Sequence, residues 1–194
     1  MPLTENSADL PRWYALHTRY QHETAIARAL EAKGIEVFLP TYNSVRQWKD
    51  RKKRICLPLF PGYLFCQRAM ESRLAILSTS GVCAILSAAG VPVAVAPDEI
   101  EAIERLVQDP GRIEPHPFLR EGNRVRVRLG PFRGIEGYLI RKKDAFRLVV
   151  SVQMLGRSAS VEIEASAVER VSVAGPFSAI SYATSIAQGP LAAY

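Results

Sequence analysis

The hydrophobic pattern of this chain changes character at one proline-rich stretch, PGRIEPHPF, residues 110–118. Before it, strand-like runs are mixed with helical periodicity. Ile100, Ile103 and Leu106, for example, share one face of a helix that opens with acidic residues and stops at Pro110. After it, only short strand-like runs follow. Because proline-rich segments act as semi-rigid spacers, the sequence predicts a linker between two domains.

The second half of the chain predicts a small all-β domain. Val125, Val127 and Leu129 alternate with arginines along NRVRVRLG, as in a strand with one buried face. The runs IEGYLIR, FRLVVSVQML, SASVEIE and AVERV follow, with turn residues between them. Closing five such strands on themselves leaves no exposed sheet edge, so we expect a small five-stranded β-barrel.

The first half predicts a domain that contains both strands and helices. WYALH predicts a first strand, and Thr18 with Gln21 has the spacing of a capping box for a helix that Gly34 can end. IEVFLPTYNSVRQW and RICLPLF predict two long strands joined at the charged tip KDRKK. The fold class is therefore α+β. The expected parts are a disordered N-terminus at 1–11, a first domain at 12–109, a linker at 110–119, a β domain at 120–172 and a flexible tail at 173–194.

The sequence offers no recognisable active site. Its only histidines, His17, His22 and His116, have no ligand spacing to a cysteine or a second histidine, and no nucleotide-binding or nucleophile motif is present. We therefore expect a binding protein without a metal or cofactor, not an enzyme. No stretch approaches the roughly 18 apolar residues of a membrane span, so we expect a cytoplasmic protein without a membrane partner. The cysteines, Cys56, Cys66 and Cys83, are expected to be buried reduced thiols.

The stretch CLPLFPGYLFC, residues 56–66, is nearly all apolar but is interrupted by a Pro-Gly pair. One interpretation is a kinked core strand in which every apolar side chain is buried. The other is a strand pair in which Phe60 and Tyr63 line a concave aromatic patch that an α-helical partner can contact. We expect the second arrangement for these two rings.

The most basic run of the chain, RQWKDRKKR, immediately precedes that stretch. Lys and Arg exceed Asp and Glu by 25 to 19, a net charge of +6 that favours encounter with polyanions without requiring it. The run is either a solvated hairpin tip or a phosphate contact that adds affinity without reading sequence. The residue types leave both interpretations open.

Two sets of motifs resemble the NusG/Spt5 family of transcription elongation factors. RVRVRLGPFRGIEGYLI is similar to the KOW motif, a strand–loop–strand of proteins that work with RNA machinery, and RWYALHTRYQHE, FLPTY and PLFPGYLF resemble the NusG N-terminal domain. The resemblance covers roughly residues 12–171. It is closest to specialised paralogues such as RfaH and the capsule-operon antiterminators. It implies an antiparallel-sheet α/β sandwich, ferredoxin- or RNP-like, followed by an SH3-like β-barrel.

The resemblance also implies function and partners. The first domain is expected to bind the clamp helices of RNA polymerase and to promote processive elongation or antitermination, and the KOW domain to recruit Rho or the ribosomal protein NusE. The protein is expected to be a monomer and to contact nucleic acid non-specifically near the transcription bubble. The implied polymerase-binding residues are Trp13, Tyr14, Leu59, Phe60 and Tyr63; the nucleic-acid-binding residues are Arg19, Arg46, Lys49, Arg51, Lys52, Lys53, Arg54, Thr79 and Ser80; the KOW partner-binding residues are Phe132, Ile135, Met154, Leu155 and Arg157.

Two features depart from the family pattern. Relatives that read a DNA element carry basic residues on the first helix, where this chain has Ala25, Ala29 and Ala32, so sequence-specific recruitment is not expected. QMLGR, residues 153–157, replaces a more aromatic pattern and suggests a changed KOW partner. The alternative function is a ribosome- or RNA-associated KOW protein without polymerase contact. In either case we expect the second domain to stay β-stranded and the linker to leave the aromatic patch open.

Overall fold

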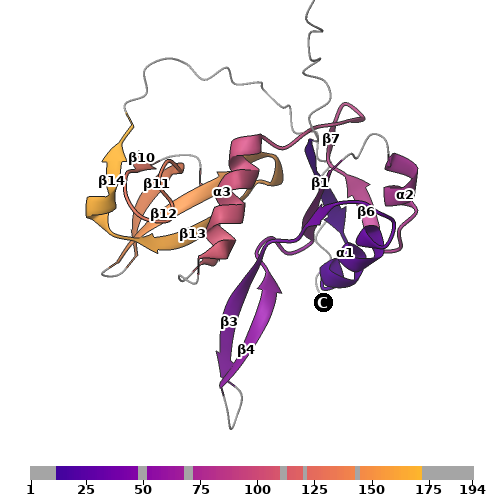
Figure 1. Cartoon of the computed structure of the whole chain (residues 1–194), viewed down its shortest axis with the longest axis horizontal. Helices are drawn as coiled ribbons and strands as arrows, with labels where there is room; N and C mark the ends of the chain where they lie inside the picture. The colour runs from indigo at the N-terminus through magenta and orange to yellow at the C-terminus, as the bar shows by residue number, and fades with distance from the viewer. Residues whose placement is uncertain are drawn as a thin grey trace, which may run out of the picture.

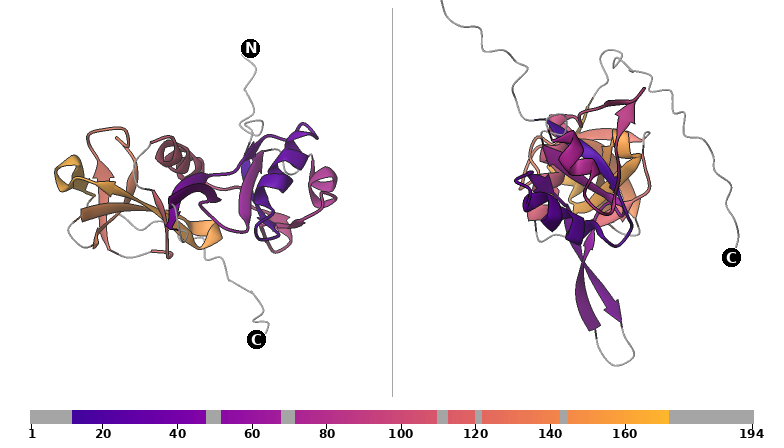
Figure 2. Two further views of the ribbon diagram at one scale, coloured as in Figure 1. Left: turned by 90° about the horizontal axis from the view of Figure 1, so that it is seen from below. Right: turned by 90° about the vertical axis from the view of Figure 1, so that its right-hand side faces the viewer.

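A computed structural model describes residues 12–47, 52–67, 72–109, 113–119, 122–142 and 145–171. Two antiparallel sheets lie at opposite ends of the molecule, and helix α3 (Pro97–Gln108) lies between them (Figure 1). A two-stranded ribbon projects away from both sheets, as the side view in Figure 2 also shows. The predicted N-terminus at 1–11 and the whole of the predicted tail at 173–194 fall outside the described residues.

The first sheet has one face covered by two helices. Its strands are β1 (Trp13–Thr18), β2 (Val37–Phe38), β5 (Tyr63–Gln67) and β6 (Val82–Ile85), in the order β2-β5-β1-β6. Leu16 and Leu64 point from this sheet towards Ile26 and Leu30 of α1 (Glu23–Glu31) and Ile76 of α2 (Arg73–Leu77). This cluster is the core that the helical periodicity predicts.

The predicted capping box at the start of α1 is wrong. Thr18 is the last residue of β1, and the N-cap of α1 is His22, which makes no side-chain capping bond. Glu23 is buried instead, and its Oε1 accepts a hydrogen bond from the Gly62 N–H at 2.7 Å. The first turn of the helix is therefore tied to a distant loop rather than to its own preceding residues. The predicted end at Gly34 is confirmed, since Gly34 takes a φ of +76° just beyond the helix.

The predicted hairpin is present as the projecting ribbon. Strand β3 (Thr41–Gln47) pairs with β4 (Lys52–Pro58) in a register that runs from Thr41 opposite Pro58 to Gln47 opposite Lys52. Pro40 divides the predicted long first strand in two, so that β2 joins the main sheet and β3 joins the ribbon. Beyond β6 lies a two-residue pair, β7 (Ser87–Ala88) with β8 (Val91–Pro92).

The second half is all-β, as predicted, but with six strands rather than five. They are β9 (Glu114–His116), β10 (Asn123–Val127), β11 (Glu136–Lys142), β12 (Ala145–Val152), β13 (Arg157–Ile163) and β14 (Val168–Arg170), in the order β14-β10-β11-β12-β13-β9. Val125, Val127, Leu148, Val150 and Val161 are buried inside, and short 3-10 turns η1 (Gln153–Leu155) and η2 (Ala165–Ala167) flank β13. Leu129, predicted on the buried face, lies beyond the end of β10 and is 65% exposed.

The additional strand β9 comes from the predicted linker. Glu114 pairs with Ser160 and His116 with Ser158, so β9 covers an edge of β13 that would otherwise be open. Pro115 lacks an N–H, which an outermost strand tolerates. Glu114 Oε2 also contacts Lys142 Nζ at 3.0 Å and Nη2 of the buried Arg147 at 3.5 Å. Backbone pairing and ion pairs therefore make this part of the linker a strand of the second sheet.

The linker was expected to hold the two domains apart or in loose contact, with the aromatic rings of the first domain open, but the two halves share one buried interior. Buried residues of both halves form one contiguous cluster, in which Ile103 and Leu106 of α3 join Phe65 of the first sheet and Val150 of the second. α3 lies directly against β12 in the views of Figures 1 and 2. The amphipathic helix predicted from its 3.6-residue period thus forms the contact between the domains.

The cysteine prediction holds for one residue of three. Cys66 on β5 is fully buried, and that burial raises the pKa of its thiol to about 12, so it stays protonated. Cys56 and Cys83 are exposed. Cys56 lies on the projecting ribbon, where no second layer covers the strands.

Candidate protein-docking surfaces

The Pro-Gly pair inside CLPLFPGYLFC forms a tight turn that ends one segment and starts β5. The Tyr63 N–H donates to the Phe60 carbonyl at 3.0 Å, and Gly62 has a φ of +81°, which fits a type II turn with Pro61 at its second position. The Gly62 carbonyl accepts from the Thr18 N–H at 2.8 Å, and its N–H donates to Glu23. The turn is therefore fixed to β1 and to α1.

The fixed turn buries Phe60 and Leu59, and the expectation that Phe60 is partly exposed is wrong. Both side chains are 1% exposed, and Phe60 makes an edge-to-face contact with Phe65 at a centroid distance of 6.3 Å. Tyr63, on the other side of the turn, is half-buried and lies 5.3 Å from the His17 ring. Only Tyr63 of the two predicted anchor rings is accessible here.

Trp13 and Tyr14 lie on opposite faces of the first sheet, because successive strand residues point in opposite directions. Tyr14 is 8% exposed and belongs to the cluster beneath α1 and α2. Trp13 is half-buried and faces the α3 side, where it meets Phe38 edge-to-face at 6.1 Å. The predicted grouping of Tyr14 with Trp13 on one surface is therefore wrong.

Three partly exposed rings pack against the α3 side of the first sheet, Trp13, Phe38 and Tyr63, and from here on these three are called the aromatic patch. The Phe38 ring stacks on the buried Phe65 ring at 5.9 Å, so the patch rests on a rigid base. Phe38 was missed from sequence. The signal was the FLP tripeptide, whose phenylalanine comes two residues before Pro40 and thus at the end of a strand.

The predicted nucleic-acid contacts do not lie on one element. Lys53 and Arg54 are exposed on the ribbon, whereas Lys49 and Arg51, and the side chains of Arg46 and Lys52, fall outside the description. Arg19 and Ser80 are exposed on loops of the first domain. Thr79 is 5% exposed, and its hydroxyl is occupied by internal bonds, donating to the Ala75 carbonyl and accepting from Lys33 Nζ. Thr79 is therefore a structural residue in this arrangement.

Most of the predicted KOW partner residues are buried. Phe132, Ile135 and Leu155 are 6%, 5% and 7% exposed and belong to the cluster shared with α3. Met154 is half-buried against that cluster, and Arg157 is exposed. Residues predicted to bind partners in both domains thus contribute to the same interior.

The side chains of two described α3 residues, Arg105 and Glu99, make hydrogen bonds to the backbone of the second domain. Nη2 of Arg105 donates to the carbonyls of Pro131 and Arg133 at 2.7 and 2.8 Å. Near the start of α3, Oε1 of Glu99 accepts from the Gln153 N–H at 3.3 Å. Burial raises the pKa of the Glu99 carboxyl above its usual value, although the Gln153 bond opposes the rise. The Arg105 contact is the stronger of the two, because a permanent cation binds two carbonyls.

Within the described ranges no group of His, Cys, Asp and Glu side chains is arranged to hold a metal ion. None of the described helices is long and apolar enough to cross a membrane. The described surface features are an aromatic patch, a ribbon with exposed basic residues and a β domain packed against α3.

Known proteins match this chain in sequence over most of its length. Residues 11–104 match the family described as "Transcription termination factor nusG". The "Transcription termination/antitermination protein NusG" of Pseudomonas aeruginosa is 30% identical over 174 residues, which cover 82% of this chain and 98% of that protein. The protein of the same name from Staphylococcus carnosus is 29% identical over 177 residues, covering 82% and 96%.

Among solved structures, the one described as "Domain interaction in Thermotoga maritima NusG" has the same fold, with a TM-score of 0.52 at 24% identity. The superposition covers 84% of this chain and 98% of the other. The chain therefore belongs to the NusG family, the non-enzymatic transcription termination/antitermination factors.

Proposed function

We propose that this NusG-family factor binds the clamp helices of RNA polymerase through the aromatic patch and promotes processive elongation or antitermination. The observation that carries the proposal is the rigid base of the patch: Trp13 and Phe38 are in contact, and Phe38 stacks on the buried Phe65. Half-buried aromatic rings lose little side-chain entropy on binding, so they make good anchors for a helical partner. Binding shifts polymerase between paused and active states by differential affinity.

The remaining parts of the proposal concern domain folds, partners and specialisation, and they rest on the resemblance to NusG-family proteins. The second domain is a five-stranded SH3-like barrel to which β9 is added, and it recruits Rho or NusE once Phe132, Ile135 and Leu155 become accessible. The first domain is a ferredoxin- or RNP-like sandwich. The chain is a monomeric cytoplasmic factor of the specialised, RfaH-like kind, and the basic ribbon lies near the transcription bubble.

Replacing Trp13 and Tyr63 by alanine is expected to weaken binding to purified core RNA polymerase by about 2–4 kcal/mol, the loss typical of aromatic interface anchors. Titration of labelled polymerase with the full chain measures it. The control is Leu74→Ala, which removes an apolar side chain that is 86% exposed on α2, on the other side of the first sheet. If the Trp13/Tyr63 variant is folded and binds polymerase with wild-type affinity, the aromatic patch is not the polymerase-binding surface. Wild-type protein that binds ribosomes but not polymerase would favour the alternative KOW function.

Neutralising the exposed ribbon residues Lys53 and Arg54 with glutamine should flatten the salt dependence of binding to a polymerase–nucleic-acid complex. Each lost phosphate contact lowers the slope of log K against log[salt] by about 0.9, so the pair removes up to about 2. Arg28→Gln with Arg73→Gln is a control of equal charge on α1 and α2. An unaltered slope would leave the ribbon as a solvated hairpin only.

General and specialised factors differ in where they act. Mapping the factor and polymerase together across the genome separates the two, since a general factor follows polymerase evenly and a specialised one gathers on a few long operons. Even coverage would contradict the RfaH-like part of the proposal while leaving polymerase binding intact.

A further inference from the structure

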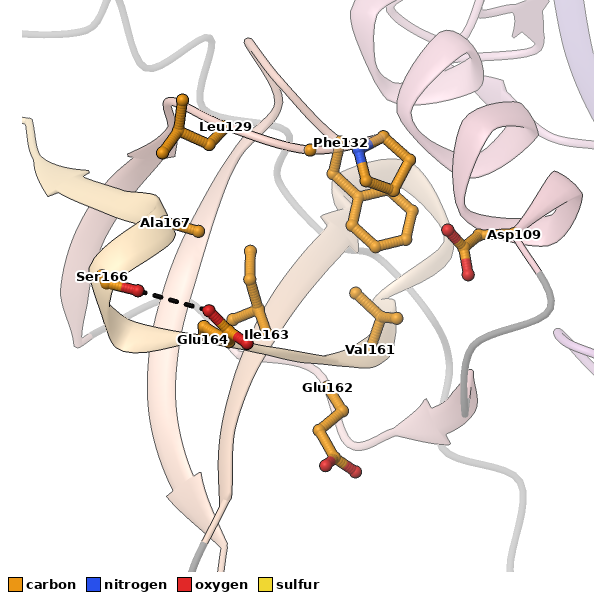
Figure 3. Close-up of a pocket in the computed structure, with 11 residues that line it drawn as sticks. Asp109, Leu129, Phe132, Val161, Glu162, Ile163, Glu164, Ser166 and Ala167 are labelled. Atoms are coloured by element: carbon orange, nitrogen blue, oxygen red, sulfur yellow. Dashed lines mark hydrogen bonds between the residues drawn. The ribbon is translucent and has the colours of Figure 1, made fainter.

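A cavity of about 350 Å³ lies between the end of α3 and the second sheet. One wall is the turn that follows β10, from Leu129 to Phe132, and another is the end of β13 with η2. Figure 3 shows Phe132, Val161 and Ile163 grouped around the cavity, with Leu129 on its rim and Asp109 facing it from α3. The volume is within the range of sites that accept a ligand or a large side chain.

The apolar part of this pocket is incompletely covered. Leu129 is 65% exposed, although the neighbouring strand residues Val125 and Val127 are each 1% exposed. An exposed leucine beside a cavity leaves apolar surface in water that a bound apolar side chain would cover, at a gain of about 25 cal/mol per Å². The pocket is thus suited to one apolar anchor.

The charge around the pocket is opposite to that of the whole chain. Three of its eleven lining residues are acidic, Asp109, Glu162 and Glu164, and none is basic, whereas the chain carries a net +6. Asp109 is also the C-cap of α3, where the helix carbonyls add partial negative charge. Arg105, the cation in the last turn of α3, is engaged by the carbonyls of Pro131 and Arg133. The rim therefore favours a cation and repels phosphate.

We propose that this pocket binds a segment of a partner protein that presents one apolar side chain next to a lysine or arginine. The apolar side chain lies among Phe132, Val161 and Ile163, and the cation pairs with the carboxylate of Glu164, which Figure 3 places beside Ile163, whereas Glu162 points away from the pocket. Of the five residues expected to contact a KOW partner, Phe132 lines this pocket and the other four do not, so the pocket overlaps that expected surface at one residue. The proposal does not depend on polymerase binding.

Binding at this pocket is coupled to domain closure. Asp109 is the C-cap that directly follows α3, and the other lining residues belong to the second domain. A ligand that contacts Asp109 as well as the second domain has its full set of contacts only in the closed arrangement and shifts the population towards it.

The test is selection from a random-peptide display library on the immobilised full-length chain, followed by titration of the enriched peptides. Enriched peptides should share an apolar residue beside lysine or arginine. Their affinity should fall at least about 3-fold in Glu164→Lys, because one attraction becomes a repulsion. The charge-matched controls are Glu162→Lys, on the adjoining strand β13 but pointing away from the pocket, and Glu36→Lys, at an exposed position of the first domain, and both should bind like wild type. Leu129→Ser, at an exposed position, should weaken the same peptides.

Three results would overturn the proposal: no enrichment, enriched peptides without a cation, or equal affinity for the pocket variants and wild type. A chain that ends at Val171 tests the remaining occupant, the chain's own residues 172–194. If those residues fill the pocket, removing them raises the affinity for the peptides, and the assignment to a partner segment is wrong. Unchanged affinity in the shortened chain supports it.

Discussion

Phe60→Ala is expected to lower the free energy of unfolding by about 3–5 kcal/mol, the cost of emptying a fully buried phenylalanine site. The ring is 1% exposed and packs on Phe65, and the hydrogen-bonded turn at Gly62 prevents the backbone from closing the space left behind. Urea unfolding of the full chain measures the change. Any loss of polymerase binding by this variant should follow the loss of folded protein.

The matched comparison is Tyr63→Ala, three residues away and half-buried, which should cost clearly less stability and more affinity for polymerase. If Phe60→Ala unfolds at the same urea concentration as wild type, the ring is not part of the core in solution. The opposite interpretation of this residue, an exposed anchor, would then be restored.

Arg105→Ala should separate the two domains. The guanidinium group binds two carbonyls of the second domain, and losing hydrogen bonds to a charged group costs about 2 kcal/mol or more, which shifts the closed-to-open ratio roughly 30-fold. In NMR relaxation measurements the domains should then tumble with separate correlation times. Arg133→Ala is the control, because the main-chain carbonyl of Arg133 and not its side chain accepts the bond.

Separating the two domains should also change the affinity for RNA polymerase. The aromatic patch and the KOW residues Phe132, Ile135 and Leu155 pack on the same interior, so releasing the contact should raise the affinity for polymerase. Separate tumbling with unchanged affinity would show that the closed arrangement does not mask the patch. Joint tumbling of Arg105→Ala would show that apolar burial alone holds the domains together.

Local pattern in the sequence was enough to predict most of the helices and strands, although not their exact ends or the strand β9. The 3.6-residue spacing along α3 and the alternation of Val125 and Val127 depend only on near neighbours, and the structure confirms both. The separation of Trp13 from Tyr14 was available from the same alternation, because adjacent strand residues face opposite ways. The error was to assign Trp13 and Tyr14 to one binding surface because they are adjacent in the sequence.

The burial of Phe60 and the pairing of β9 were not available from local pattern. Phe60 is buried because α1 fixes the turn through Glu23 and because α3 joins the two halves, and both contacts span long sequence separations. The segment EPH has the composition of a linker, and only the register of β13 makes it a strand. The same holds for the candidate site residues. The sequence identified aromatic and basic residues suited to binding, but whether each side chain is exposed depends on distant segments that pack against it.

Strand β9 also determines how far the second domain can travel. α3 ends at Gln108 and β9 begins at Glu114, so residues 109–113 are the linker between them. Fully extended, these five residues span at most about 17 Å. While β9 stays paired, an opened second domain remains at an effective concentration in the millimolar range beside the first. Any partner that it carries is therefore delivered next to whatever the first domain has docked on. If β9 detaches from β13, the linker lengthens to residues 109–122, which span roughly 45–50 Å when extended. The second domain can then lie at either of two maximum distances from the first, depending on whether β9 is paired.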